Sequence, residues 1–248
     1  MDSGLYSAYS GLRANADMLE VLSNNLANIN TTGFKGEETF FRTYNRAVSE
    51  SMLPPLDQAI NDSTVVQGSV TNFQGGPVMT TGRDLDVALE GSGFLSIETP
   101  AGTRYTRNGK LNVNSAGHLV TSEGFAVLGK GGPISVPRGK VDISLTGEIE
   151  VNKVRVDTLK IVDFADRTQL EKVGNSLFQT RGTGIAEQEP KDVLVRQGAL
   201  EQSNVNPVQQ MMLMINMMRQ FEGLQKAIHT VMNTVNSQSI NQVGRAVI

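Results

Sequence analysis

The sequence predicts an α+β protein. Long helices at the two ends of the chain are expected to pair as a coiled-coil-like module, and an all-β domain lies between them in the sequence. Three observations lead to this fold class. Apolar residues recur every seven positions near both ends of the 248-residue chain, which is the spacing of a helical seam. Most of the 25 glycines separate short β-rich runs in the middle. The apolar faces of the two terminal helices are therefore expected to pack against partner helices.

The first helix is expected from about Ser3 to about Asn28, followed by Thr31, Thr32 and Gly33, which are typical of a helix end. One side of it carries two apolar rows interrupted by a single asparagine, and a polar residue in a seam selects register. The candidate seam residues of this helix are Leu5, Leu12, Asn15, Leu19, Leu22, Leu26 and Ile29.

After the helix the sequence loses a clear period. We expect an extended connector over residues 36–63, since this stretch carries Pro54 and Pro55 and mixes charges with isolated aromatics. The resulting division of the chain is a helix and turn over 1–35, the connector, a β-domain over 64–196 and a final helical segment over 197–248.

Turn chemistry supports the β-domain. Asn108-Gly109 and the run from Asn114 to Gly117 each lie between strand-like segments, where a hairpin needs residues that tolerate positive φ. The last helix is expected to begin at Asn206-Pro207, with the asparagine as the cap and the proline in the first turn. It should run to about Ser239. Its apolar rows supply further candidate seam residues: Met211, Met214, Met218, Phe221, Leu224, Ile228, Val231 and Val235.

Composition disfavours several classes of function. The net charge is -3 and the basic residues are scattered, so we expect no nucleic-acid partner. There is no cysteine, no basic and apolar leader, and no apolar run long enough for a membrane span, so we expect neither membrane insertion nor a cleaved signal peptide. His118 and His229 stand far apart, and acidic pairs such as Asp84 with Asp86 are typical of solvated strand edges. We therefore expect no catalytic residue, no metal site and no cofactor.

The residues leave three classes of function open. The helical seams favour an assembly protein. A secreted β-domain that binds or hydrolyses glycans, with the helices as its ordinary core, is the competing class. An export-coupled regulator or cap that binds only transiently is the third.

Three segments resemble the flagellar rod, hook and hook-filament axial proteins of bacteria. The first is SGLRANADMLEVLSNNLANINTTGFK, which ends at Lys35, and its most specific pieces are NNLAN and TGFK. The second spans Gly82 to Pro137, and the third spans Gln197 to Ile228. RYTRNG and SNVNPV look most like the proximal-rod branch, with the distal-rod branch as runner-up and the hook less similar. The signature-turn residues are Asn24, Asn25, Asn28, Gly33, Phe34 and Lys35.

The resemblance implies a structural subunit of the basal-body rod, which polymerises helically through its terminal helices into a hollow drive shaft that transmits torque across the periplasm. It also implies export through the flagellar type III apparatus without a cleaved signal peptide. The implied partners are copies of the same chain, other rod and axial proteins, and the ring proteins that surround the rod.

Overall fold

The computed structural model describes residues 2–44, 63–182 and 185–245. In these ranges the chain forms two α-helices, one short 3-10 helix and the strands β1 to β18, so it is mostly β-structure in several sheets. It divides into two compact units. Unit 1 is made of Met1–Leu26, Glu37–Val70 and Asn206–Ile248, and unit 2 is made of Ala27–Gly36 and Thr71–Val205.

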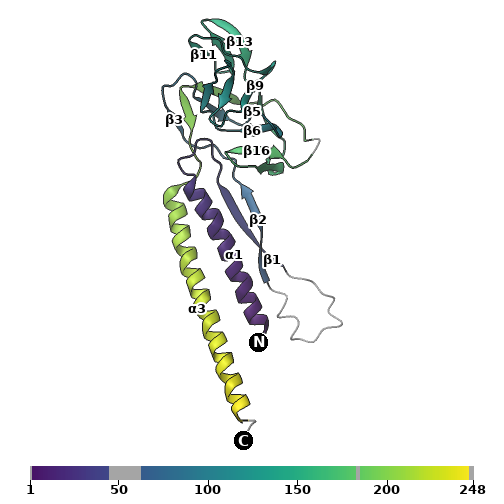
Figure 1. The fold of residues 1–248 in the computed structure, drawn as a ribbon, viewed down its shortest axis with the longest axis vertical. Helices are drawn as coiled ribbons and strands as arrows, with labels where there is room; N and C mark the ends of the chain where they lie inside the picture. The colour runs from purple at the N-terminus through teal and green to yellow at the C-terminus, as the bar shows by residue number, and fades with distance from the viewer. Residues whose placement is uncertain (1, 45–62, 183–184, 246–248) are drawn as a thin grey trace. The chain divides into compact units, whose positions relative to one another are not determined.

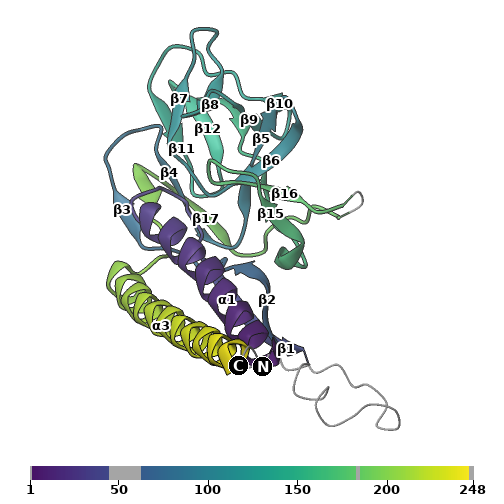
Figure 2. The ribbon, with the colours of Figure 1, turned by 60° about the horizontal axis from the view of Figure 1, so that its bottom comes forward.

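Unit 1 holds the two long helices and a pair of strands. The helices are α1 (Asp2–Ala27) and α3 (Pro207–Arg245), and β1 (Glu37–Tyr44) pairs with β2 (Ser63–Thr71). α1 and α3 run side by side in opposite directions, and the β1–β2 pair lies on the other side of α1 (Figures 1 and 2). The segment expected to be an extended connector therefore contains β1, while residues 45–62 fall outside the described residues.

The predicted coiled-coil-like pairing of the two terminal helices is wrong. Among the residues that the structure describes, no coiled-coil pairing of α1 with α3 is present, and no described apolar side chain of α3 is fully buried. The physical reason is that the apolar residues of α3 spread around the helix in several rows, so that one antiparallel neighbour leaves part of them in water. The predicted central β-domain is present in part, because strands also occur beside α1 and between Gln197 and α3.

The start of α3 is the one that the sequence predicts. The side chain of Asn206 accepts hydrogen bonds from the backbone N–H groups of Val208 at 3.1 Å and Gln209 at 3.2 Å. These donors have no partner inside the helix, so the cap stabilises its first turn. Pro207 occupies the first helical position, where no N–H is needed.

Unit 2 is built from short strands. The largest sheet has nine strands in the order β15-β16-β6-β5-β9-β8-β7, with β10 on β9 and β14 on β5; β11-β12-β13 form a second sheet, and β17-β4 and β18-β3 form two pairs. The strand bounds are β3 Val78–Thr80, β4 Val87–Gly91, β5 Phe94–Thr99, β6 Gly102–Thr106, β7 Leu111–Val113, β8 Leu119–Thr121, β9 Ala126–Gly129, β10 Gly132–Pro133, β11 Val141–Ile143, β12 Glu148–Val151, β13 Val154–Thr158, β14 Ile161–Val162, β15 Leu170–Lys172, β16 Leu177–Thr180, β17 Val193–Gln197 and β18 Ala199–Glu201. A 3-10 helix, η1 (Arg167–Gln169), precedes β15.

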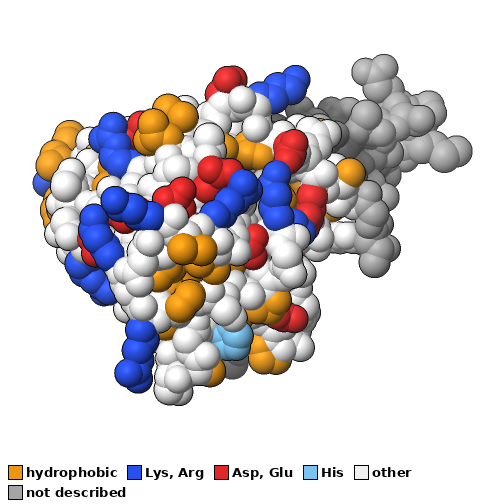
Figure 3. Space-filling model, turned by 90° about the horizontal axis from the view of Figure 1, so that it is seen from above, with side chains coloured by type: hydrophobic (Ala, Val, Ile, Leu, Met, Phe, Trp, Pro, Cys, Tyr) orange, Lys and Arg blue, Asp and Glu red, His pale blue; other side chains and the backbone are white. Residues whose placement is uncertain are grey.

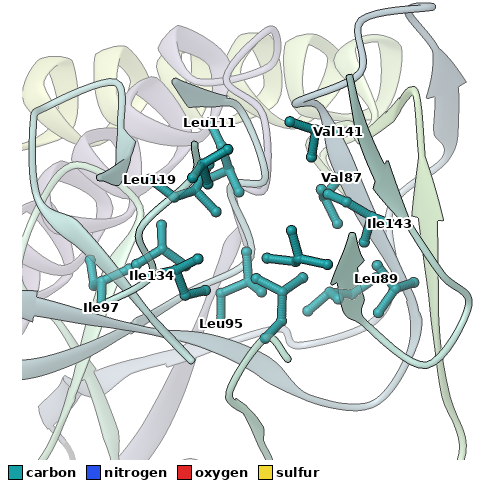
Figure 4. Packing of buried hydrophobic residues seen from close by; sticks show 14 of the residues in the cluster. Val87, Leu89, Leu95, Ile97, Leu111, Leu119, Ile134, Val141 and Ile143 are labelled. Atoms are coloured by element: carbon teal, nitrogen blue, oxygen red, sulfur yellow. The ribbon is translucent and has the colours of Figure 1, made fainter. Parts of the chain in front are cut away.

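The core of unit 2 is aliphatic, with a smaller aromatic cluster. Leu95 and Ile97 of β5, Leu111 of β7 and Leu119 of β8 share one buried cluster with Val87 and Leu89 of β4 (Figure 4). Phe94, Phe164 and Phe178 pack edge-on or tilted against one another, with ring centroids 5.7 and 6.2 Å apart. Burial of these side chains supplies the main driving force for folding of this unit.

One of the two predicted hairpin turns is confirmed. Asn114 accepts hydrogen bonds from the N–H groups of Ala116 and His118, Gly117 has φ of 83°, and β7 pairs with β8. The hairpin predicted at Asn108-Gly109 is wrong, because β6 pairs with β5 and β16 rather than with β7. Gly109 instead passes directly against the backbone of Val87, where a Cβ would have no room.

The described helices are α1, η1 and α3. None of them carries an apolar stretch long enough to cross a membrane. On the face shown in Figure 3, Lys and Arg side chains are interspersed with Asp and Glu.

Candidate assembly interface

The part of the signature turn from Asn28 to Lys35 follows α1 and belongs to unit 2. Gly33 has φ of 66°, a region that side chains with a Cβ rarely adopt, and a Cβ at this position would overlap the backbone of Arg107 and Asn108. The Gly33 N–H donates to the backbone carbonyl of Glu201 at 2.8 Å. The hydroxyl of Thr32 donates to the side-chain oxygen of Asn108 at 2.7 Å. Only glycine fits this close approach of three chain segments.

Lys35 ends the signature with a fully buried ammonium group. Its Nζ donates to Glu201 Oε1 at 2.5 Å and to the carbonyl of Gln74 at 2.8 Å. Burial lowers the pKa of Lys35, and the neighbouring Glu201 carboxylate partly offsets this effect by favouring the charged form. The lysine of the signature is therefore held by a specific partner within unit 2 and does not face solvent.

Arg107 completes a buried charge cluster with Lys35 and Glu201. Its Nη1 lies 3.4 Å from Glu201 Oε2 and donates to the carbonyl of Leu89, and its Nη2 donates to Gly91. Burial lowers the pKa of Arg107, with Glu201 acting in the opposite direction. The Oε1 atom of Glu201 also accepts from the N–H of Gly76 at 2.9 Å. The carboxylate of Glu201 thus forms ion pairs with both Lys35 and Arg107.

Sequence reasoning missed Arg107 and Glu201. Both lie in segments that carry the resemblance, RYTRNG and QGALEQ, yet neither segment indicates a partner for Lys35. Glu201 is 166 positions away from Lys35. A pairing over that distance leaves no local pattern, and the signal that remains is a single lysine between Phe34 and Gly36 in a turn without other charged residues.

Asn25 has the most defined role among the asparagines of the signature. It is buried, its Nδ2 donates to the carbonyl of Glu37 at 2.8 Å, and its Oδ1 accepts from the Glu37 N–H at 2.9 Å. These two bonds tie the end of α1 to the start of β1 within unit 1. Asn24 is exposed, and Asn28 accepts from the N–H of Thr31.

The predicted seam of α1 is only partly covered. Leu22 is buried, while Leu12, Asn15, Leu19 and Leu26 are half-buried. The side chain of Leu5 lies outside the described residues. α1 ends at Ala27, so Ile29 lies beyond the helix in the segment that belongs to unit 2.

The predicted seam of α3 divides between two faces. Met214, Phe221, Leu224 and Ile228 are half-buried, and the side chain of Val235 lies outside the described residues. Met211 and Met218 are each 50% exposed, and Val231 is 47% exposed. Around the first two, the early turns of α3 present a continuous outer stripe of exposed apolar side chains, namely Val208, Met211, Met212, Ile215 and Met218. Large exposed apolar patches are typical of protein interaction sites.

The histidines and acidic pairs do not converge. His118 Nδ1 lies 3.0 Å from the hydroxyl of Ser135, and His229 is exposed on α3. Within the described part of the chain, no group of three or more His, Asp or Glu side chains is placed to hold a metal ion.

Three family models match the chain in the expected order. The flagella basal body rod protein model matches residues 5–35, the flagellar hook protein FlgE/F/G D1 domain matches 88–152, and the flagellar basal body rod FlgEFG protein C-terminal model matches 196–242. The "Flagellar basal-body rod protein FlgF" of Caulobacter vibrioides is 35% identical, with 91% of this chain and 92% of that protein covered. The chain belongs to the flagellar basal-body rod protein family.

Other members of the rod protein family are similarly close. The "Flagellar basal-body rod protein FlgG" of Borreliella burgdorferi is 35% identical over 93% of this chain and 95% of that protein. The FlgG protein of Bacillus subtilis is 32% identical over 91% of this chain and 94% of that protein. The matched regions contain the signature turn and most of both terminal helices.

Proposed function

We propose that this chain is a structural subunit of the flagellar basal-body rod, and that it polymerises helically through its terminal helices into the hollow drive shaft that transmits torque across the periplasm. The observation that carries the proposal is the outer stripe of α3, whose members are 50% to 66% exposed in a chain that belongs to the rod family. The stripe and the half-buried α1 residues are the surfaces that neighbouring subunits cover.

The energetics of this stripe favour assembly. Burying apolar surface stabilises by about 25 cal/mol per Å², and several half-exposed Met, Val and Ile side chains on successive turns still have much of their area to bury. Methionine adapts its shape, so a stripe with three of them suits packing against the slightly different neighbours of a helical assembly. Copies of the same chain and other rod or axial proteins are the partners that fit.

Membership of the rod family supports three finer assignments within this proposal. The subunit occupies the basal body, reaches the periplasm through the flagellar type III export apparatus, and is encircled by ring proteins. RYTRNG and SNVNPV favour the proximal-rod position, although relatives named FlgF and FlgG are equally identical to the chain at 35%. The subunit acts by packing and not by catalysis, and family membership argues against the secreted glycan module.

Replacing Met218 by Asp tests the proposal. Met218 is half exposed, so the variant should fold, but a carboxylate in a surface that becomes buried on assembly loses its solvation without gaining a partner. We expect basal bodies without this chain and non-motile cells. Gln225→Asp is the matched control, because Gln225 lies two turns further along the same side of α3 and is already polar. Normal rods that contain the Met218→Asp chain would refute the proposal.

A further inference from the structure

The chain passes between its two units four times. At three of these crossings, the residues that belong to unit 2 are hydrogen-bonded to one another. The crossings fall between residues 26 and 27, 36 and 37, 70 and 71, and 205 and 206. Gly36, Asn72 and Asn204 stand within two residues of the last three. All three residues belong to unit 2, and they are hydrogen-bonded to one another.

The bonds between these residues form a closed set. The Gly36 N–H donates to Asn204 Oδ1 at 2.7 Å, and the Asn72 N–H donates to the Gly36 carbonyl at 2.8 Å. Asn204 Nδ2 returns a bond to the Asn72 carbonyl at 2.8 Å. Each residue is thus held by both of the others, although they come from distant parts of the sequence.

The buried charge cluster is connected directly to this set. Lys35 precedes Gly36, and its ammonium shares the carbonyl of Gln74 with Asn204 Nδ2, at 2.8 and 3.1 Å. Glu201 stands three positions before Asn204 and accepts from Lys35, from Gly76 and, through its own backbone carbonyl, from Gly33. The same two segments therefore carry both the ion pairs and the asparagine bonds.

We propose that Lys35, Gly36, Asn72, Glu201 and Asn204 form a clasp that keeps three of the chain's crossing points together at unit 2. The clasp is held by the buried ion pairs and by the amide of Asn204, so loss of either should loosen it. If the chain is a rod subunit, as proposed above, the clasp makes the connections to α3 and to the β1–β2 pair share a mechanical load. Without the clasp, a load applied to one connection would be borne by that connection alone.

Substitutions in the clasp should differ in effect according to the net charge that they leave buried. Glu201→Gln leaves the ammonium of Lys35 and the guanidinium of Arg107 buried without a carboxylate, and an uncompensated buried charge is strongly destabilising. Lys35→Met leaves Arg107 and Glu201 as a neutral pair. The first substitution should therefore open the clasp more than the second.

Amide hydrogen exchange of the purified full chain tests this order. In Glu201→Gln we expect exchange at the Gly36 and Asn72 amides to accelerate on the order of a hundredfold. Lys35→Met should accelerate the same amides less, and Asn204→Ala, at a half-buried position, should accelerate Gly36 even if Glu201→Gln does not fold. The Ser96 and Leu119 amides, which bond to Lys160 and Ile134 elsewhere in unit 2, should keep their rates.

Lys130→Met is the matched control. It removes a lysine whose ion pair with Glu189 is exposed, and exposed pairs contribute little. Wild-type exchange at Gly36 and Asn72 in all three clasp variants would overturn the proposal. Equal acceleration at Ser96 and Leu119 would overturn it as well, because the effect would then be a general loss of stability.

The mechanical consequence is tested separately in cells. Strains with Asn204→Ala should swim normally in dilute medium and lose speed in viscous medium, whereas Lys130→Met should match the wild type in both. Wild-type speed at every viscosity would overturn the mechanical role. Absence of the wild-type chain from purified basal bodies would contradict the proposed function instead, and it would leave the exchange result unaffected.

Discussion

Two residues of the signature turn are fixed by close contact and by charge. Gly33 is required because backbone from Arg107 occupies the place where a Cβ would stand, and because its φ of 66° is costly for other residues. Lys35 is required for a different reason, since its buried ammonium neutralises Glu201. A short sequence motif can thus be explained by packing inside unit 2, without any contact to a ligand.

The contact at Gly33 can be separated from its backbone conformation. Gly33→Ala should lower the unfolding free energy of unit 2 by well over 1 kcal/mol, because strain at positive φ is joined by overlap with the Arg107 backbone. Gly82 has a similar φ of 73° and open space where a Cβ would point. Gly82→Ala should therefore show the conformational cost alone. Thermal denaturation compares the two variants, and equal losses would contradict a role for the contact.

At the scale of elements, success of the sequence-based prediction follows the range of the interaction. The cap at Asn206 and the turn at Asn114 to Gly117 act over two to four residues, and both were predicted. The hairpin at Asn108-Gly109 was wrong, because the same turn residues also serve where the chain crosses a distant strand. The predicted coiled-coil-like pairing of the terminal helices was wrong for a related reason. An apolar row on a helix indicates that this face packs against something, but it does not identify the partner.

The connection between β14 and β15 depends on acidic side chains, and this gives it a pH dependence. Burial raises the pKa of Asp163, but hydrogen bonds from the Arg167 side chain and the Phe164 N–H more than offset it, so the pKa is lowered overall. The stabilisation is therefore present above the unfolded-state pKa of about 3.9 and is lost as the pH falls through the lower folded value.

Asp163→Asn removes this dependence. The melting temperature of the wild type should fall more steeply than that of Asp163→Asn when the pH is lowered from about 5 to about 3, because only the wild type has this carboxylate to protonate. Thermal melts at both pH values measure the difference. Asp142→Asn is a useful comparison, since Asp142 forms an exposed pair with Lys140. Parallel pH profiles for wild type and Asp163→Asn would rule out a stabilising role for this group.

At the scale of the whole molecule, the signature turn joins a helical segment to a β-rich unit that does not need that helix for its core. Unit 2 buries its own aliphatic and aromatic clusters, and residues 27–36 belong to it. Unit 1 leaves apolar side chains of α3 exposed. The two units therefore differ in what they need: unit 2 is complete within the chain, and unit 1 is completed by assembly under the proposed function.

Two deletions that differ by ten residues separate these roles. Removing 1–26 takes away nearly all of α1 but keeps Asn28, Gly33, Phe34 and Lys35 of the signature turn, so unit 2 should retain a cooperative melt close to that of the full chain while incorporation into basal bodies is lost. Removing 1–36 also takes Gly33 and Lys35, which leaves the Glu201 carbonyl without its donor and the carboxylate without its closest cation. We expect the melting temperature of unit 2 to fall by roughly 5 °C or more in the longer deletion alone. Equal melting temperatures would mean that the turn only connects the units, and rods built from either shortened chain would mean that α1 is not part of the assembly surface.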